Sequence, residues 1–207
     1  MAKIKLTKGE LKRQRDSLSQ YLRYLPTLLL KKQQLQIEIL HQLALLEQKT
    51  KEEQDKKLSY ESWAGLLKAD SGININQWLK PKKIVTSRKN IAGVDLEVFV
   101  NVDFDRLEYD LFIYPLWVDA AIEHLRAIVS LRQELEIIKK EIEVLRHELR
   151  ITTQRVNLFE NVKIPQSQEA IRVIKIYLGD QMANAVGRSK IAKRKISEAT
   201  TYEAIAA

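Results

Sequence analysis

The sequence contains no cysteine, only four prolines and six glycines among 207 residues, and only 7% aromatic residues. The lack of cysteine excludes disulfide bonds and thiolate metal sites, and it is compatible with a reducing cytosol. Because prolines and glycines are so few, long stretches carry no residue that breaks a helix. The low aromatic content and the 30% of charged residues are typical of long solvated helices rather than of a compact enzyme core.

Long hydrophobic runs are missing as well. No uninterrupted apolar stretch approaches the roughly 18 residues that mark a membrane-spanning helix. The first residues, MAKIKLTKGELKRQRD, are charged throughout and lack the apolar centre of a signal peptide. The sequence therefore predicts a soluble, cytoplasmic protein without direct membrane insertion.

The motifs of common catalytic and cofactor sites are also absent. The chain has no Walker-type glycine loop, no GxGxxG and no GxSxG. Its three histidines, His41, His124 and His147, are far apart in sequence, and no second histidine follows His147 at the zinc-protease spacing. We therefore expect a chain that is not an enzyme and that holds no cofactor and no metal.

The longest stretch free of both proline and glycine covers residues 116–164. Within it, eight mostly apolar residues recur at alternating three- and four-residue steps, which keeps one face of a helix against a partner helix. This pattern predicts a coiled-coil seam formed by Leu135, Ile138, Ile142, Leu145, Leu149, Thr152, Val156 and Phe159.

A second apolar row occupies the same helix at seven-residue intervals. It lies about 100° around the helix from one edge of the seam, so one partner helix cannot cover both rows. A folded-back part of the same chain is the alternative cover. The row is a candidate partner-subunit face, formed by Ile137, Val144, Ile151 and Leu158.

A helical pattern also covers about residues 8–60, with an apolar stripe wider than a two-stranded seam requires. Pro26 lies inside it and is expected to kink the helix or to end it one residue earlier. A corresponding break is expected at Pro165, after which the apolar register restarts one position out of phase with Phe159. We expect a bend or softened zone where these two breaks come close.

The residues between the two helical patterns have a different character. A turn is expected at 70–72 and a short helix before Pro81, and the hydrophobic period then changes to two, with SRKN as the turn signal. This middle region should form a hairpin that caps the far end of the helical pair. We therefore predict a mainly α protein, a long antiparallel two-helix coiled coil with short helices and a β-hairpin between, divided into residues 1–60, 61–115 and 116–207.

The net charge is +8, and the cations gather at the two ends of the chain. Residues 1–15 hold six lysines and arginines against one acidic residue, and residues 186–198 hold five against one. If the terminal helices pair antiparallel with aligned tips, residue 5 lies opposite about residue 195 and Pro26 opposite about residue 174. The basic side chains would then share one tip: Lys8, Lys12, Arg13, Arg15, Arg188, Lys190, Lys193 and Arg194. Solvated, frayed ends are the plain alternative.

Three parts of the sequence resemble a known family. They are the arm KLTKGELKRQRDSLSQYLRYLPTLLLKKQQLQIE, the segment RKNIAGVDLEVF with the later LWVDAAIEHL, and the run RVNLFENVKIP. On these segments the chain is similar to the D subunits that form the central rotor shaft of V-type and A-type rotary ATPases, over nearly its entire length. Glu97 stands where many relatives have proline, so the exact shape of the hairpin is left open.

The resemblance implies a central stalk protein that performs no bond chemistry. It would transmit torque between the nucleotide-binding hexamer and the membrane ion-translocating ring, in ATP synthesis or in ATP-driven proton or sodium transport. The implied partners are the A and B subunits of the hexamer, the small F subunit of the stalk, and the socket protein (C or d) above the ring. We expect the hexamer at the basic tip, and the F subunit on the second apolar row and the wide N-terminal stripe. The chain would be peripheral to the inner membrane through this complex.

The competing class is a coiled-coil binding module. A prefoldin-like chaperone also places helical arms around a β-hairpin, but its tips should be apolar rather than basic. A nucleic-acid-binding coil should show a steep salt dependence of affinity. We expect neither, and no nucleic acid as partner.

Overall fold

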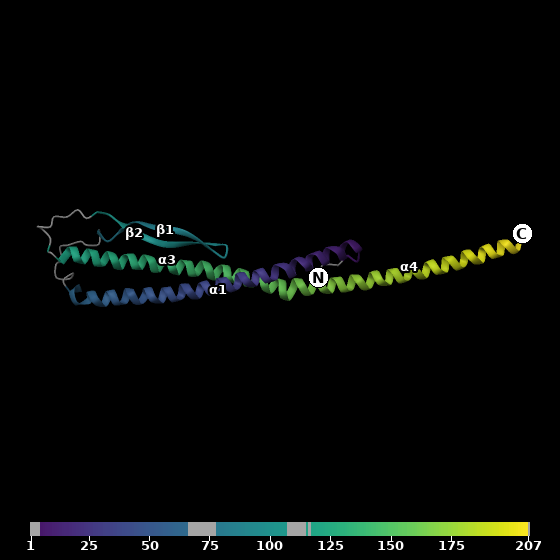
Figure 1. The fold of residues 1–207 in the computed structure, drawn as a ribbon, viewed down its shortest axis with the longest axis horizontal. Helices are drawn as coiled ribbons and strands as arrows, with labels where there is room; N and C mark the ends of the chain where they lie inside the picture. The colour runs from purple at the N-terminus through teal and green to yellow at the C-terminus, as the bar shows by residue number, and fades with distance from the viewer. Residues whose placement is uncertain (1–4, 66–77, 107–114, 116, 207) are drawn as a thin grey trace. The chain divides into compact units, whose positions relative to one another are not determined.

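The computed structural model describes residues 5–65, 78–106, 115 and 117–206. Its elements are, in chain order, α1 (Lys8–Ala64), β1 (Pro81–Ile91), β2 (Val94–Phe104), α3 (Trp117–Leu158), the π-helical turn η2 (Phe159–Lys163) and α4 (Ile164–Ala206) (Figure 1). The predicted mainly helical fold, with long N- and C-terminal helices and a small antiparallel hairpin between them, is confirmed. The expected turn at 70–72 and most of the short helix before Pro81 lie outside the described residues.

The chain divides into two compact units. Unit 1 comprises Met1–Leu29 with Gln154–Ala207, and unit 2 comprises Leu30–Thr153. Each unit therefore contains one part of the N-terminal helix and one part of the C-terminal helical stretch. The hairpin belongs to unit 2.

Helix α1 begins at a cap that the sequence encodes. Thr7 accepts a hydrogen bond on its Oγ1 from the Glu10 backbone N–H at 3.3 Å, and its carbonyl accepts one from Leu11 N–H at 3.0 Å. Threonine followed three residues later by glutamate is the pattern of a helix start. The helix then runs through Pro26 to Ala64, so the expectation that it ends there is wrong. A proline inside a helix costs about 3 kcal/mol, which tertiary packing along a long helix can offset.

The expected break at Pro165 is instead a change of helix type. Just before this proline, Ile164 donates its backbone N–H to the Phe159 carbonyl, five residues earlier, which defines η2. A π turn adds one residue to the helix and so shifts every later side chain around it. Thr152 and Phe159 belong to one seven-residue series, which would continue at positions 166 and 173. The buried residues are instead Ser167 and Ile174, each one position later. The shift of register that the sequence indicated is thus the extra residue of η2.

The core of unit 2 joins both helices to the hairpin. It contains Leu35 and Ile39 of α1, Leu145 of α3, and Val94 and Leu96 of β2. The hairpin therefore lies along the helical pair, as Figure 1 shows beside α3, and does not cap its end as expected. The apolar side chains of β2 are covered better by the long side of two helices than by their narrow ends.

The hairpin turn lies two residues beyond the predicted signal. SRKN belongs to β1, and Ala92 and Gly93 form the turn, both with positive φ (52° and 75°), between the paired residues Ile91 and Val94. Two-residue turns of this kind match the twist of the strands. Asn90, the last residue of the signal, supports the turn, because its Oδ1 accepts a hydrogen bond from Gly93 N–H at 3.2 Å.

Two ion pairs join α1 and α3 within unit 2. Lys49 lies 3.3 Å from Glu134, and Arg132 donates to Glu53 at 3.0 Å. These pairs connect residues far apart in sequence, so they contribute to the antiparallel register of the two helices. None of the helices in the described part of the chain is long and apolar enough to cross a membrane.

Candidate partner-binding surfaces

The predicted seam residues lie inside the two units. Within unit 2, the first four are buried and Leu149 is half-buried against the core; within unit 1, Val156 is buried. The Phe159 ring contacts the Tyr21 ring of α1 in a tilted arrangement, with ring centroids 5.1 Å apart and an angle of 44° between the ring planes. The seam residues thus pack mainly within the chain itself, and Leu149 and Phe159 keep part of their surface exposed.

The second apolar row on α3 is covered at one end and open at the other. Ile137 is only 8% exposed, whereas Val144 is 44% exposed and Leu158 is 41% exposed. The hairpin contacts α3 both before and after Ile137. Before it, Arg126 lies over the Phe104 ring, and after it, Leu145 packs in the core shared with β2. The start of the row is therefore buried by the chain itself, whereas Val144 in unit 2 and Leu158 in unit 1 are exposed, and the partner-subunit face stays a prediction.

The wide stripe of α1 leaves an apolar groove in unit 2. Ile37 and Leu40 are each 67% exposed, although they belong to one of the most apolar parts of the sequence. Together with Ile39 and Leu149 they border a groove of about 630 Å³, whose remaining lining is Gln33 and Gln36. Exposed apolar side chains that gather in a groove are typical of a protein interface.

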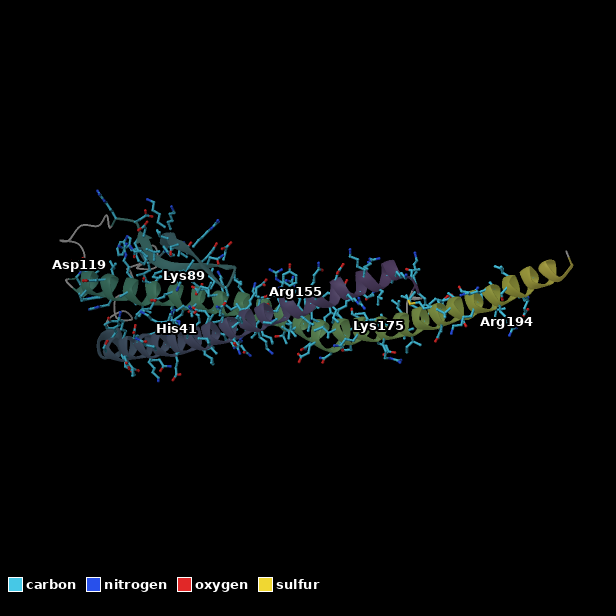
Figure 2. The ribbon with its side chains drawn as sticks, turned by 45° about the vertical axis from the view of Figure 1, so that its right-hand side comes forward. His41, Lys89, Asp119, Arg155, Lys175 and Arg194 are labelled. Atoms are coloured by element: carbon cyan, nitrogen blue, oxygen red, sulfur yellow. The ribbon has the colours of Figure 1, made fainter. Side chains whose placement is uncertain are left out.

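The eight predicted tip residues are all exposed, but they do not form one tip. The contact between the Tyr21 and Phe159 rings defines the antiparallel register of unit 1, so the start of α1 lies well before the basic segment of α4. Figure 2 shows α4 continuing past the start of α1, with Lys175 and Arg194 labelled on it. The same register places Pro26 before Phe159 along the helical stretch, not opposite residue 174. The expected alignment is wrong because apolar contacts set the register, whereas aligned chain ends gain no free energy.

Among the described residues, the basic side chains near the end of α4 have only local partners. Arg188 donates to the Asn184 carbonyl at 3.4 Å, and Arg194 lies 3.4 Å from Glu198. Both interactions stay within one turn of the same helix, and exposed pairs of this kind contribute about 0.5 kcal/mol or less. This segment therefore presents mobile positive charge with little to hold it on its own chain.

A clamp between hairpin and helix was not foreseen from the sequence. The Arg126 guanidinium donates to the Trp78 carbonyl at 2.9 and 3.0 Å and to the Asp105 carbonyl at 2.8 Å. It also lies 4.9 Å above the Phe104 ring. One side chain of α3 thus holds the backbone just before β1 and just after β2, at the open end of the hairpin. Only a structure could show which arginine does so.

A buried polar group between the elements was also missed. Glu141 of α3 is 5% exposed, and burial raises the pKa of its carboxyl, as does the negative charge of Glu38 to a smaller extent; Lys89 acts in the opposite direction. Gln42 is buried too, and its Oε1 has no hydrogen-bond partner among the described residues. Its Nε2 donates to Glu38 at 3.1 Å.

The described residues offer no metal site. No group of three or more histidine, aspartate or glutamate side chains in this part of the chain is placed to hold an ion. The candidate sites are therefore surfaces: the groove beside Ile37 and Leu40, the exposed part of the second row, and the basic end of α4.

Comparison with known proteins gives a consistent result. The family model that describes the D subunit of ATP synthases matches residues 10–194. A protein of Borreliella burgdorferi, named as the D subunit of a V-type ATP synthase, is 44% identical over 196 residues, which are 95% of this chain and 96% of that protein. Proteins of the same name from Chlamydia caviae and Chlamydia trachomatis serovar L2 are each 30% identical over 198 residues, covering 95% of this chain and 95% and 98% of theirs. The similarity thus extends over almost the full length of all four chains.

Proposed function

Because the chain belongs to the family of ATP synthase D subunits, whose members are non-catalytic stalk proteins of the V-type rotary complex, we propose that it is the central rotor shaft of that complex. The resemblance drawn from the sequence is confirmed, and other subunits of the complex are its partners. The finer proposal is that the chain transmits torque between a nucleotide-binding hexamer and a membrane ion-translocating ring. It would serve ATP synthesis or ATP-driven proton or sodium transport, in the cytoplasm at the inner membrane.

One observation carries this proposal. The end of α4 continues past the start of α1 and carries Arg188, Lys190, Lys193 and Arg194 in exposed positions. A slender basic helix can enter a collar and be attracted by acidic loops from several directions, because charge-steered contacts of mobile side chains require no single deep socket. We propose that the A and B subunits of the hexamer form this collar.

A mechanism follows from this arrangement. ATP hydrolysis in the hexamer changes which catalytic interface is closed, and each closure pushes on the basic end of the shaft. The shaft makes and breaks no covalent bond. Its contribution is stiffness, which the buried seam of each unit and the ion pairs between α1 and α3 support.

The apolar surfaces suit the remaining partners. We propose that, within unit 2, the small F subunit of the stalk covers the groove at Ile37 and Leu40 and the exposed Val144 of the second row. We propose further that the socket protein, C or d, binds unit 2 at the end where α1 finishes and α3 begins, that is, on the side of residues 61–115. When a partner buries an apolar side chain that is two-thirds exposed, the burial favours binding by about 1 kcal/mol or more.

The tip role is tested by charge removal. We expect that replacing five exposed cations at the end of α4, Arg188, Lys190, Lys193, Arg194 and Lys195, by glutamine lowers ATP hydrolysis coupled to ion transport at least fivefold in a reconstituted complex, while the F subunit still binds. The charge-steered contacts with the collar would be lost. The measurements are ATPase turnover in the reconstituted complex and a pull-down with the F subunit.

The matched control removes the same amount of charge elsewhere. Five exposed cations of unit 2, Lys51, Lys139, Lys140, Arg146 and Arg150, are replaced by glutamine. Coupled turnover of this control should stay within twofold of the unaltered chain. Equal losses in both variants, or unchanged turnover in the first, would contradict the tip role.

A further inference from the structure

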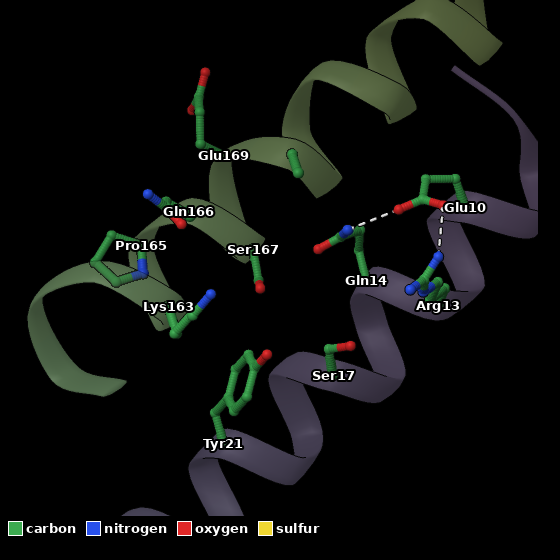
Figure 3. Close-up of a pocket in the computed structure, with 11 residues that line it drawn as sticks. Glu10, Arg13, Gln14, Ser17, Tyr21, Lys163, Pro165, Gln166, Ser167 and Glu169 are labelled. Carbon is green, nitrogen blue, oxygen red and sulfur yellow. Dashed lines mark hydrogen bonds and ion pairs between the residues drawn. The ribbon is translucent and has the colours of Figure 1, made fainter. Parts of the chain in front are cut away.

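A cleft of about 670 Å³ lies between α1 and α4 inside unit 1, next to η2. Its volume falls within the range of about 300–1,000 Å³ that is common for small-molecule sites. Figure 3 shows Gln14 and Tyr21 of α1 pointing into the same space as Lys163 and Ser167 from the opposite side. A π turn inside an α-helix is frequently found at a functional site, and here its last residue, Lys163, lines the cleft.

Two cations line this cleft: Arg13 lies 4.0 Å from Glu10, whereas Lys163 has no partner among the described residues. Lys163 is half-buried, and it makes no ion pair or hydrogen bond with any other residue that the structure describes. Elsewhere in unit 1 the neighbouring charges are engaged, because Arg172 donates to Glu169 at 2.7 and 2.8 Å. The Lys163 ammonium is therefore a donor that the fold has positioned without using it.

The hydroxyl groups around Lys163 are also unengaged. Thr50 and Ser189 donate to backbone carbonyls four residues earlier, as serine and threonine in helices commonly do. In contrast, Ser17 and Ser167, which both line the cleft, make no hydrogen bond with the described residues, and Ser167 is only 6% exposed. The Tyr21 ring is held by its tilted contact with Phe159, and its hydroxyl donates no hydrogen bond to the described residues, so it can donate into the cleft that Tyr21 lines.

The carboxylates near the cleft do not compete for Lys163. Glu10 accepts a hydrogen bond from Gln14 at 2.8 Å and lies 4.0 Å from Arg13. Glu169 is neutralised by Arg172, whose hydrogen bonds hold the pKa of its carboxyl below the usual range. Arg13, Glu10 and Glu169 also line the cleft, but each has a partner of its own. What remains for a ligand is one unpaired ammonium and several hydroxyl donors, a set that fits an oxyanion.

We propose that this cleft binds a small oxyanion of the phosphate class, with Lys163 supplying the charge and the hydroxyls of Ser17, Tyr21 and Ser167 donating hydrogen bonds. The ligand is either free inorganic phosphate or the terminal phosphate of a nucleotide. Bound there, it bridges α1 and α4 directly beside η2, so it ties the two helices together at the irregular turn. This is a ligand site on the shaft itself and goes beyond torque transmission.

The test uses the isolated full-length chain, so its outcome does not depend on assembly of the complex. Isotope-labelled protein is titrated with inorganic phosphate, and separately with ADP, at constant ionic strength maintained with chloride. Backbone amide shifts are followed by NMR. We expect saturable shifts around Ser17 and Ser167 and at least a tenfold loss of affinity in Lys163→Gln, with Lys163→Arg retaining most of it.

The matched control is Lys175→Gln, an exposed cation farther along α4 that does not line the cleft. It should bind like the unaltered chain. Saturation by phosphate alone identifies the free ion as ligand, and tighter saturation by ADP identifies a nucleotide; either supports the site. Shifts that do not saturate, or an equal loss of affinity in Lys175→Gln, would overturn it. Circular dichroism confirms that each variant is folded.

Discussion

At the scale of the residue, Glu141 shows how a single carboxyl can make stability depend on pH. It is buried between α3, the α1 residue Glu38 and the β1 residue Lys89, and its pKa is raised mainly by burial. A carboxyl whose pKa is higher in the folded state favours folding while it is protonated. That contribution is complete below the unfolded-state pKa and is lost as the pH rises through the folded-state pKa.

We therefore expect Glu141→Gln to stabilise the chain at pH 8 by about 1–3 kcal/mol, because a buried charge is replaced by a neutral amide of similar size. At pH 4 the difference should be much smaller, since the carboxyl is then largely protonated. Urea unfolding followed by circular dichroism at both pH values measures this. Glu143→Gln, two residues along α3 and exposed, is the control and should change stability little at either pH. A gain that is equal at pH 4 and pH 8 would contradict the assignment.

At the scale of the element, the hairpin depends on contacts at its two ends. At the turn, Gly93 has a positive φ and Asn90 closes the loop through its side chain. At the open end, Arg126 holds the carbonyls of Trp78 and Asp105. Since β1 is exposed along most of its length, the hairpin has little other packing to keep it on the helices.

Arg126→Ala should accordingly loosen the hairpin without unfolding the helices. Hydrogen bonds from a charged group are each worth about 1.5–3 kcal/mol, so we expect the local opening free energy of β1 and β2 to fall by about 2–4 kcal/mol. Hydrogen exchange of the strand amides measures this opening, and helical circular dichroism should not change. Arg150→Ala removes an exposed arginine from the same helix and should leave strand exchange as it is. Equal exchange in both variants would show that Arg126 is no clamp.

At the scale of the whole molecule, the apolar residues fall into two sets: those buried in the core, which stabilise the fold, and those left exposed, which we propose bind partners. Leu145 and Leu35 belong to the inner core, whereas Ile37 and Leu40 are equally apolar and largely exposed. Loss of an exposed side chain changes stability by about 0.5 kcal/mol or less, in contrast to about 2–5 kcal/mol for a core leucine cut to alanine. Binding and folding can therefore be disturbed separately.

The double variant Ile37→Asn, Leu40→Asn should lower affinity for the F subunit at least tenfold, because two anchors of the proposed groove become polar. Its unfolding free energy should stay within about 1 kcal/mol of the unaltered chain, since both side chains are exposed. Affinity is measured by calorimetry with the purified F subunit. The control, Met182→Asn with Val186→Asn, alters two similarly exposed apolar residues of α4 and should bind normally. Undiminished affinity in the first variant would place the F subunit elsewhere.

The sequence by itself determined the helical pattern, the change of period at the hairpin, the shift of apolar register after Phe159 and the family. Each of these depends on local spacing: seven-residue repeats, alternation, or a short run such as RVNLFENVKIP. The broad apolar stripe around Ile37 also indicated correctly that α1 has more apolar surface than one partner helix covers.

Only the tertiary structure decided how these elements pair. It placed Tyr21 against Phe159 and so set the register of unit 1, turned the hairpin back along the helices, and put Lys163 in a cleft with Tyr21 and Ser167. The physical reason is that an amphipathic helix can slide against its partner by whole turns and still bury an apolar face. Contacts between residues far apart in sequence, which local spacing does not encode, select one of these arrangements.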